Sequence, residues 1–209
     1  MFPYKFFKQV FLARKLQFTK GQIKLFEQPM LFIPMEYVVE ITKNIFSNGK
    51  DYMLERYLEA WKAGVIFMNT LAEKYRMKSF DERYKIAMEI IAMAGFGDYE
   101  TVKFQKHLSY FKIINNPIAE YFKKSKIPVD VILRGFNAGG GTPVHEMIIN
   151  TIETHCKAVT GRHCIHINAN TETLKKYKDQ KLVSEQLDLN WLLPRQKKIL
   201  NELNINISE

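Results

Sequence analysis

The sequence predicts an α+β fold, and two observations carry this prediction. Segments of β-rich composition come in neighbouring pairs, at residues 10–34, 98–114 and 145–169, and helical patterns fill the stretches between and after them. Strands and helices do not alternate singly, so the order differs from that of a parallel βαβ protein. With 209 residues, of which 46% are hydrophobic, the chain is long enough for one domain with a real core.

The N-terminal part is expected to form a hairpin followed by helices. Residues 10–18 and 23–34 are β-rich runs joined at a Lys-Gly turn, and Pro29 places the second run at an edge or a bulge. Beyond them, apolar residues recur at the spacing that gives a helix one buried face. The expected helices span residues 35–46, 52–75 and 80–94.

The sequence of residues 98–141 predicts one or two further strands and two helices. Residues 98–114 are expected as one or two strands that turn near His107, and Pro117 opens a short helix. A second helix is expected to begin after Pro128 and to span 129–141, and its small residues would let it pack very closely on a neighbour. Those small residues are Gly135, Ala138 and Gly139.

The last pair of strands is expected at residues 145–157 and 162–169, around a Thr-Gly turn. The glycine run at 139–142 suggests a phosphate loop, but no lysine follows it and no strand precedes it, so we expect a plain loop between helix and strand. The segment 174–209 is charged and helix-prone, and we expect it to be broken at Pro194.

Composition and charge argue against several classes of protein. Lys and Arg exceed Asp and Glu by nine, but the basic clusters lie at expected helix ends, so we do not expect nucleic-acid binding. Only Cys156 and Cys164 occur, which excludes a disulfide scaffold and favours an intracellular compartment. No apolar stretch approaches the length of a bilayer span, so we expect a soluble, cytoplasmic protein.

Side chains that can bind a metal are most concentrated in residues 152–164, the segment IETHCKAVTGRHC. A hairpin turn in its middle would place Cys156 and Cys164 opposite one another on one face, where their thiolates can converge on a metal ion. Their spacing is not that of a zinc knuckle, so two ordinary buried cysteines remain an alternative. His155 and His163 each adjoin a cysteine and are expected to point to the opposite face.

Three pieces of the sequence resemble a known family: NNPIAEYF (115–122), PVDVILRGFNAGGG (128–141) and ETHCKAVTGRHC (153–164). Residues 110–170 are similar to the 4-vinyl reductase domain, also described as a predicted hydrocarbon-binding domain. That family includes sensor domains of aromatic-responsive bacterial regulators and a protein associated with bacteriochlorophyll synthesis. Taken as a whole, the Lys- and Ile-rich chain resembles a stand-alone archaeal member.

The resemblance implies a twisted antiparallel sheet carrying helices, similar to vesicle-transport (TRAPP) subunits. It also implies a single ligand-binding domain over residues 1–172, in which a hairpin and helices over 1–95 precede the family core. A charged helical tail, 173–209, would follow. Members commonly form homodimers, and the apolar excess of the hairpin and of residues 35–77 favours a homodimer here.

The resemblance also implies a metal site. In phenol-sensing relatives, zinc is held by a Cys after a Pro-Val pair, a Glu, a Cys three positions later and a Cys eight positions beyond. Carried over, these positions are Asp130, Glu153, Cys156 and Cys164. Asp replaces the first Cys, which gives two sulfur and two oxygen ligands and could make the site looser or water-exchangeable. His155 is a possible substitute ligand.

From this resemblance we expect a zinc-stabilised domain that binds a small hydrophobic or aromatic molecule, as a sensor or carrier. A zinc ion with four protein ligands is structural, so we do not expect catalysis. A reductase, as the family name suggests, and a dimeric protein-interaction module are the alternatives, although no flavin, NAD or iron–sulfur signature is present. Candidate pocket residues are Trp61, Phe67, Met68, Met88, Met93, Phe96, Tyr99, Phe104, Phe111 and Phe136.

Overall fold

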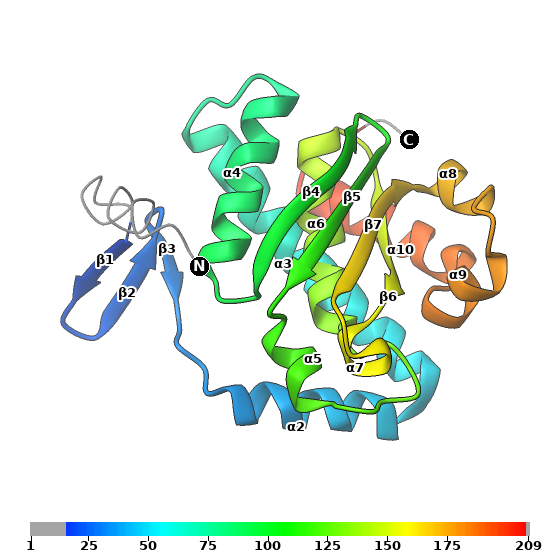
Figure 1. Ribbon diagram of the computed structural model, residues 1–209. Coiled ribbons are helices and arrows are strands. Elements are labelled where there is room, and N and C mark those ends of the chain that lie inside the picture. The colour runs from blue at the N-terminus through cyan, green and yellow to red at the C-terminus, as the bar shows by residue number, and fades with distance from the viewer. Residues whose placement is uncertain (1–15, 208–209) are drawn as a thin grey trace.

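The computed structural model describes residues 16–207, except for the side chains of Ala92 and Met93. Its strands form two antiparallel sheets (Figure 1). The small sheet has the order β1-β2-β3, and its strands are β1 (Leu16–Thr19), β2 (Gln22–Leu25) and β3 (Gln28–Met30). The main sheet has the order β4-β5-β7-β6, and its strands are β4 (Asp98–Gln105), β5 (Leu108–Ile114), β6 (Ile149–His155) and β7 (Cys164–Asn170). The predicted α+β class with antiparallel strands is confirmed.

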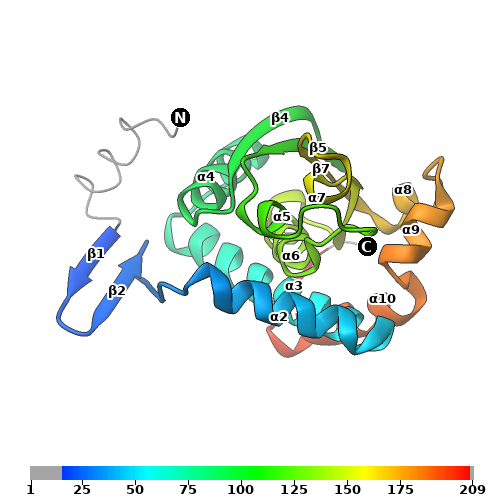
Figure 2. The same ribbon diagram turned by 60° about the horizontal axis from the view of Figure 1, so that its bottom comes forward.

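Helices form the other layers of the molecule. In Figure 2, α6 lies between the main sheet and α3, and α2 runs alongside α3 and also contacts α5. Helices α8, α9 and α10 stand at the β6 end of the sheet (Figure 1). The helices of the described residues are α2 (Met35–Ser47), α3 (Gly49–Lys74), α4 (Phe80–Met93), α5 (Pro117–Tyr121), α6 (Val131–His145), α7 (Lys157–Thr160), α8 (Thr171–Lys175), α9 (Gln180–Gln186) and α10 (Leu189–Glu202). No helix in this part of the chain is long and apolar enough to cross a membrane.

Two of the three expected turns are present. The third differs, because helix α7 occupies the connection before the Thr-Gly turn, and the strand predicted over 145–157 is shorter, since His145 belongs to α6 and β6 spans Ile149–His155. The Lys-Gly turn joins β1 to β2, with Gly21 at a φ of +78°, a left-handed conformation that favours glycine. A second turn, which was not expected, separates β2 from β3, and Pro29 lies in β3 at the edge of this sheet, as predicted. The predicted part of the hairpin before residue 16 lies outside the described residues. Residues 98–114 form β4 and β5, which turn at His107 as expected.

Helices α3 and α6 touch backbone to backbone, as the small residues of α6 predicted. A Cβ atom on Gly139 would lie 1.9 Å from the carbonyl oxygen of Trp61. One on Gly135 would lie 2.4 Å from the carbonyl oxygen of Tyr57. From the other helix, a Cβ on Gly64 would lie 2.4 Å from a carbonyl oxygen of α6. Real Cβ atoms do not approach so closely, so this packing depends on glycine.

The glycine run belongs to helix α6, so the expectation of a loop at 139–142 was wrong. The helix continues to His145 and ends where Glu146 adopts a left-handed φ of +56°. Glycine and Pro143 are unfavourable inside a helix, but α6 is buried along nearly its whole length between the sheet and α3. Tertiary packing therefore stabilises a segment whose local composition indicates a helix end.

The C-terminal segment is helical and packs into the main core, but the expected break at Pro194 is absent. Pro194 does not break α10, which runs from Leu189 to Glu202 through it. The buried side chains of this segment join the same hydrophobic cluster as Trp61 and Ile152. They are Leu174, Val183, Leu187, Leu192 and Leu200.

Two glutamines of this segment pair with β6, an edge strand of the main sheet. Gln186 accepts a hydrogen bond from the Glu153 backbone N–H and donates one to the Glu153 carbonyl, both at 2.8 Å. Gln196 exchanges side-chain hydrogen bonds with Asn150, at 2.8 and 3.2 Å. The C-terminal helices therefore fix the backbone of the strand that carries one of the predicted metal ligands.

Candidate metal centre and apolar cavity

The inner face of the main sheet carries rows of buried side chains that point at α6. Glu153 of β6 lies opposite His166 of β7, which lies opposite Phe111 of β5. Residues opposite one another in antiparallel strands share a face, and so do residues two apart on one strand. Cys164 therefore shares this face with His166. The next row is formed by Thr151, Asn168 and Ser109.

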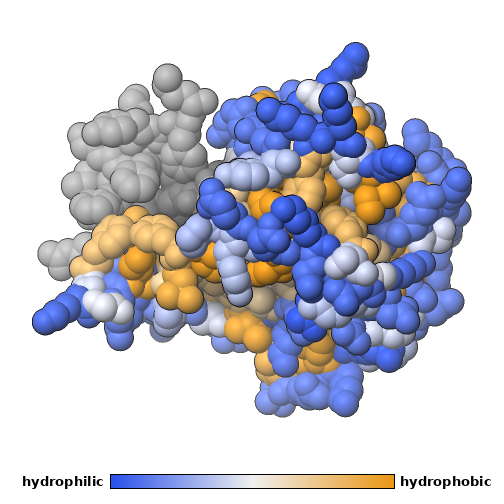
Figure 3. Space-filling model, turned by 90° about the horizontal axis from the view of Figure 1, so that it is seen from below, coloured by the Kyte–Doolittle hydropathy of each residue, from blue (hydrophilic) through white to orange (hydrophobic). Residues whose placement is uncertain are grey.

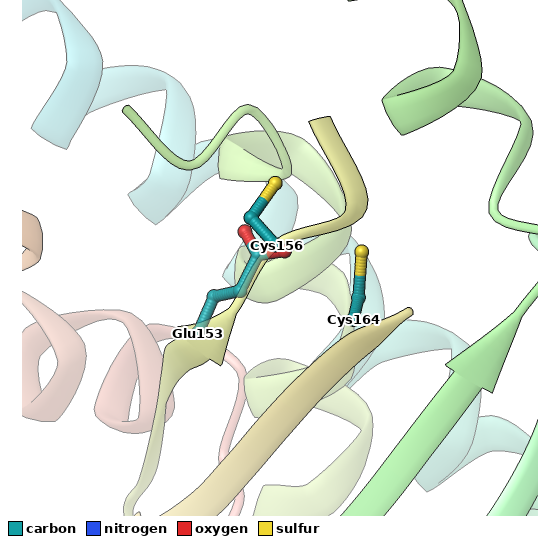
Figure 4. A group of neighbouring side chains, drawn as sticks. All are labelled: Glu153, Cys156 and Cys164. Carbon is teal, nitrogen blue, oxygen red and sulfur yellow. The ribbon is translucent and has the colours of Figure 1, made fainter. Parts of the chain in front are cut away.

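The four predicted metal ligands lie in one buried region. Figure 4 shows Glu153 and Cys156 close together at the end of β6, with Cys164 across from them on β7. The ligand atoms of these three residues all lie within 4.8 Å of one another. Asp130, just before α6, forms a second group of the same size with Glu153 and His166. Glu153 is common to both groups, and all five side chains are at most 3% exposed.

His155 and His163 point away from this region, as predicted. Both rings lie outside the two groups of candidate ligands, and they stack on each other with centroids 6.4 Å apart. The structure therefore does not bring His155 to the predicted metal site. It brings His166 instead, which the sequence analysis did not single out although Cys164 and His166 have the spacing of one strand face.

Burial and mutual contact change the acidity of these groups. A hydrogen bond from Cys164 lowers the pKa of the Cys156 thiol to about 6, and retaining that proton raises the pKa of Cys164. Burial, and then the neighbouring Asp130, raise the pKa of Glu153 well above its usual value. The Cys156 thiol therefore loses its proton more readily than a free cysteine, and the thiolate is the form that binds metals.

Several buried polar atoms of the centre have no hydrogen-bond partner. They include Asp130 Oδ1 and both carboxylate oxygens of Glu153. Leaving such atoms unpaired costs about 1–3 kcal/mol each, and more when they are charged. Two thiols, two carboxylates and an imidazole are a donor set that suits zinc better than magnesium or calcium. The residues present therefore fit a zinc ion.

Asn116 orients two of the predicted ligands. Its Nδ2 donates to Asp130 Oδ2 at 2.5 Å and lies 3.5 Å from Cys164 Sγ, while its Oδ1 caps helix α5 by accepting from the Ala119 N–H. The backbone N–H of Lys157 also donates to Cys164 Sγ, at 3.2 Å. The Asn-Pro helix start was visible in the sequence, but its second role depends on tertiary contacts.

An apolar cavity lies next to the metal centre, between helices α3, α4 and α6 and the inner face of the sheet. Its volume is about 30 Å³, room for one or two water molecules. Among the predicted pocket residues, the cavity is lined by Phe67, Met68, Met88, Phe111 and Phe136. Trp61, Phe96, Tyr99 and Phe104 pack outside it, and the side chain of Met93 lies outside the described residues.

His145 gives this cavity a hydrogen-bond acceptor. Its Nδ1 lies 2.6 Å from the backbone carbonyl of Lys106, which can only accept, so Nδ1 carries the proton. Burial lowers the pKa of His145 to about 4, so the ring is neutral at pH 7. Nε2 is then an acceptor, and the buried hydroxyl of Ser109 lies 3.3 Å from it. Both side chains line the cavity.

Comparison with solved structures relates this arrangement to a known fold. The phenol-responsive sensory domain of the transcription activator PoxR, solved with phenol, matches with a TM-score of 0.71 over 88% of this chain and 96% of that chain. The chain has the fold of that sensory domain. The sequences are only 14% identical, so the match shows the fold alone. No family model matches the sequence, and no curated protein is detectably similar to it.

Two further structures match less closely. One is a vinyl-4-reductase family protein from Methanocaldococcus jannaschii, with 19% identity, a TM-score of 0.47, and coverage of 66% of this chain and 82% of that one. The other is a trafficking protein particle complex subunit 3 from Naegleria fowleri, covalently bound to palmitic acid, with 12% identity, a TM-score of 0.48, and coverage of 65% and 90%. With TM-scores below 0.5, these two matches establish nothing further about this chain.

Asn137 connects the cavity to the candidate metal centre. Asn137 lines the cavity, and its Nδ2 lies 3.2 Å from Nδ1 of His166. The other ring nitrogen of His166, Nε2, faces Asp130 Oδ2 at 3.3 Å. A single buried side chain of α6 therefore contacts both the cavity and a member of the metal centre.

Proposed function

We propose that this chain binds a small aromatic molecule carrying a hydroxyl group, and that it serves as a sensor or carrier domain. The observation that carries the proposal is the apolar cavity whose polar wall includes the neutral imidazole of His145. Small-molecule sites are mostly apolar with a few fixed polar groups. The unprotonated Nε2 accepts one hydroxyl, so a ligand hydroxyl would take the place of the Ser109 hydroxyl, which lies 3.3 Å from it. The phenol bound to the similarly folded sensory domain supports the same ligand class.

The cavity must enlarge for a ring to enter. At about 30 Å³ it is roughly an order of magnitude smaller than a typical ligand pocket. Two of its walls are the side chains of Met68 and Met88, and methionine has three rotatable bonds and adapts readily to new neighbours. Ligand binding therefore requires these side chains to change rotamer, at a cost that lowers the affinity.

Calorimetric titration with phenol and with toluene tests this proposal. The two ligands differ by a hydroxyl in place of a methyl group, so the wild type should prefer phenol by roughly three-fold to ten-fold, the worth of one hydrogen bond. His145→Leu should remove this preference. The matched control His155→Leu changes an exposed histidine and should keep it. Absence of binding by either ring at millimolar concentration would contradict the proposed function.

We also propose that a zinc ion is held by Asp130, Glu153, Cys156 and Cys164. When bound, zinc supplies a crosslink and neutralises buried negative charge. The side chains involved come from the start of α6, from the end of β6 and from the first residue of β7. The unpartnered oxygens of Asp130 and Glu153 support this assignment. A reductase activity remains a prediction that an assay with a reductant would decide.

A homodimer also remains a proposal. Apolar side chains gather on the β1–β3 end of the molecule, seen at the left of Figure 3. Phe18 and Phe32 pack on each other there, with ring centroids 6.4 Å apart, while both are more than half exposed. We propose that a second copy of the chain covers this end, which light scattering at micromolar concentration would test. The exposed apolar residues are Phe18, Leu31, Phe32, Ile33 and Tyr37.

A further inference from the structure

His166 lies among the candidate metal ligands with a ring nitrogen directed at both carboxylates. Its Nε2 is 3.3 Å from Asp130 Oδ2 and 3.9 Å from Glu153 Oε1. All three side chains have no exposed surface. His166 shares its strand face with Cys164, two residues earlier on β7. The sheet therefore presents a nitrogen and a sulfur donor from one strand to the same buried region.

Several buried oxygens around His166 have no hydrogen-bond partner, and a bound cation would give them a partner. Both Glu153 oxygens and one Asp130 oxygen are buried without a hydrogen-bond partner. The buried guanidinium of Arg134 interacts electrostatically with both carboxylates, but its Nε and Nη1 also have no hydrogen-bond partner. Arg134 thus leaves these oxygens unbonded, although it supplies positive charge nearby. An ion seated between the carboxylates and the imidazole would bond to all of them at once.

We propose that His166 is a further ligand of the metal ion, bound through Nε2. This inference rests on the proposed metal centre and adds a nitrogen donor to its sulfur and oxygen ligands. Glu153 links the two groups of donor atoms, since it lies within 4.8 Å of the cysteines and of Asp130 and His166 alike. The two groups share only Glu153, so a single ion with ligands from both groups also requires the side chains to close around it.

Asn137 is placed to orient the imidazole for this role. A histidine that binds metal through Nε2 carries its proton on Nδ1 and donates it to an acceptor. Asn137 lies 3.2 Å from Nδ1 through its Nδ2, and its Oδ1 is buried without a partner. Half a turn of the amide exchanges these two atoms, so that Oδ1 accepts from Nδ1–H. The rotation gives the unpaired oxygen a partner, moves Nδ2 to the position that Oδ1 held, and leaves Nε2 for the ion.

The decisive measurement uses the wild-type chain loaded with an NMR-active cadmium isotope and labelled at the histidine nitrogens. We expect one ion per chain and a resolved coupling between cadmium and Nε2 of His166. If one ion binds but no histidine coupling is found, His166 is not a ligand and the proposed zinc site stands. If no ion binds, the proposed metal centre itself fails. Two ions per chain would contradict the single shared site.

Variants provide an independent test in cobalt-loaded protein. His166→Asn should change the cobalt d–d absorption and weaken metal binding at least ten-fold, while the thiolate-to-cobalt band persists. The matched control His155→Asn alters an exposed histidine near Cys156 and should leave both bands unchanged. Asn137→Leu should weaken metal binding by roughly ten-fold to a hundred-fold, as loss of an orienting partner does. An unchanged d–d spectrum in folded His166→Asn would overturn the inference.

Discussion

Gly139→Ala should prevent the chain from folding, or should lower its free energy of unfolding by more than about 4 kcal/mol, the range of severe core defects. The added Cβ would lie 1.9 Å from the carbonyl oxygen of Trp61 and 2.7 Å from its carbonyl carbon. Both atoms belong to the backbone of α3, so no side-chain rotamer can relieve the clash. Urea unfolding followed by circular dichroism measures the effect.

The neighbouring glycine provides the matched control. A Cβ on Gly140 would meet no atom within 4 Å, although the residue lies in the same helix. Alanine is a better helix former than glycine by about 1 kcal/mol, so Gly140→Ala should leave stability unchanged or raise it. If the two variants lose stability equally, the close contact of α3 and α6 is not what makes Gly139 necessary.

Removal of the metal should cause the second large effect. Structural zinc sites contribute on the order of 10 kcal/mol of folding free energy, because ligands bind the ion only in the native state. Chelation should therefore lower the melting temperature by at least about 10 °C, and Cys156→Ser should reproduce this loss together with the loss of stoichiometric metal. Differential scanning calorimetry with metal analysis measures both quantities.

Removal of the metal also tests whether the metal centre affects ligand binding in the cavity. Asn137 lines the cavity and contacts His166 of the metal centre. Metal-free protein should therefore bind phenol more weakly, although phenol does not bond to the metal. His163→Ala, at a partly exposed ring outside the centre, is the control and should change neither metal content nor melting temperature. A wild-type protein purified with almost no metal, or with a disulfide between Cys156 and Cys164, would exclude the zinc site.

The sequence was sufficient to predict the elements whose signals are local. Helix α3, the turn between β4 and β5 and the Asn-Pro start of α5 follow from periodicity and capping chemistry. Elements stabilised by distant contacts were harder to predict. Helix α6 continues through four glycines and Pro143 because α3 and the sheet enclose it. Helix α10 passes through Pro194 because Leu192 and Leu200 are buried in the main core.

In the candidate site, too, some residues were predictable from local sequence and others depend on distant contacts. The positions of Glu153, Cys156 and Cys164 depend on one local hairpin, so their proximity was predictable from spacing. Asp130 is close to them only through the packing of α6, and its assignment depended on the family resemblance. The involvement of His166 required the strand register, which sequence spacing suggests but does not fix. The acceptor role of His145 depends on a carbonyl of the β4–β5 turn and leaves no sequence pattern.

The side chains that pair with β6 also limit how copies of this protein can associate. An edge strand with free backbone groups can add a strand from another chain and extend the sheet between molecules. At β6, Gln186 occupies both backbone groups of Glu153, and the Tyr57 hydroxyl accepts from the Thr151 N–H at 2.9 Å. Strand addition at this edge would require the C-terminal helices to detach first. Any intermolecular sheet would therefore have to form elsewhere, and fibril growth through β6 should begin only after α9 unfolds.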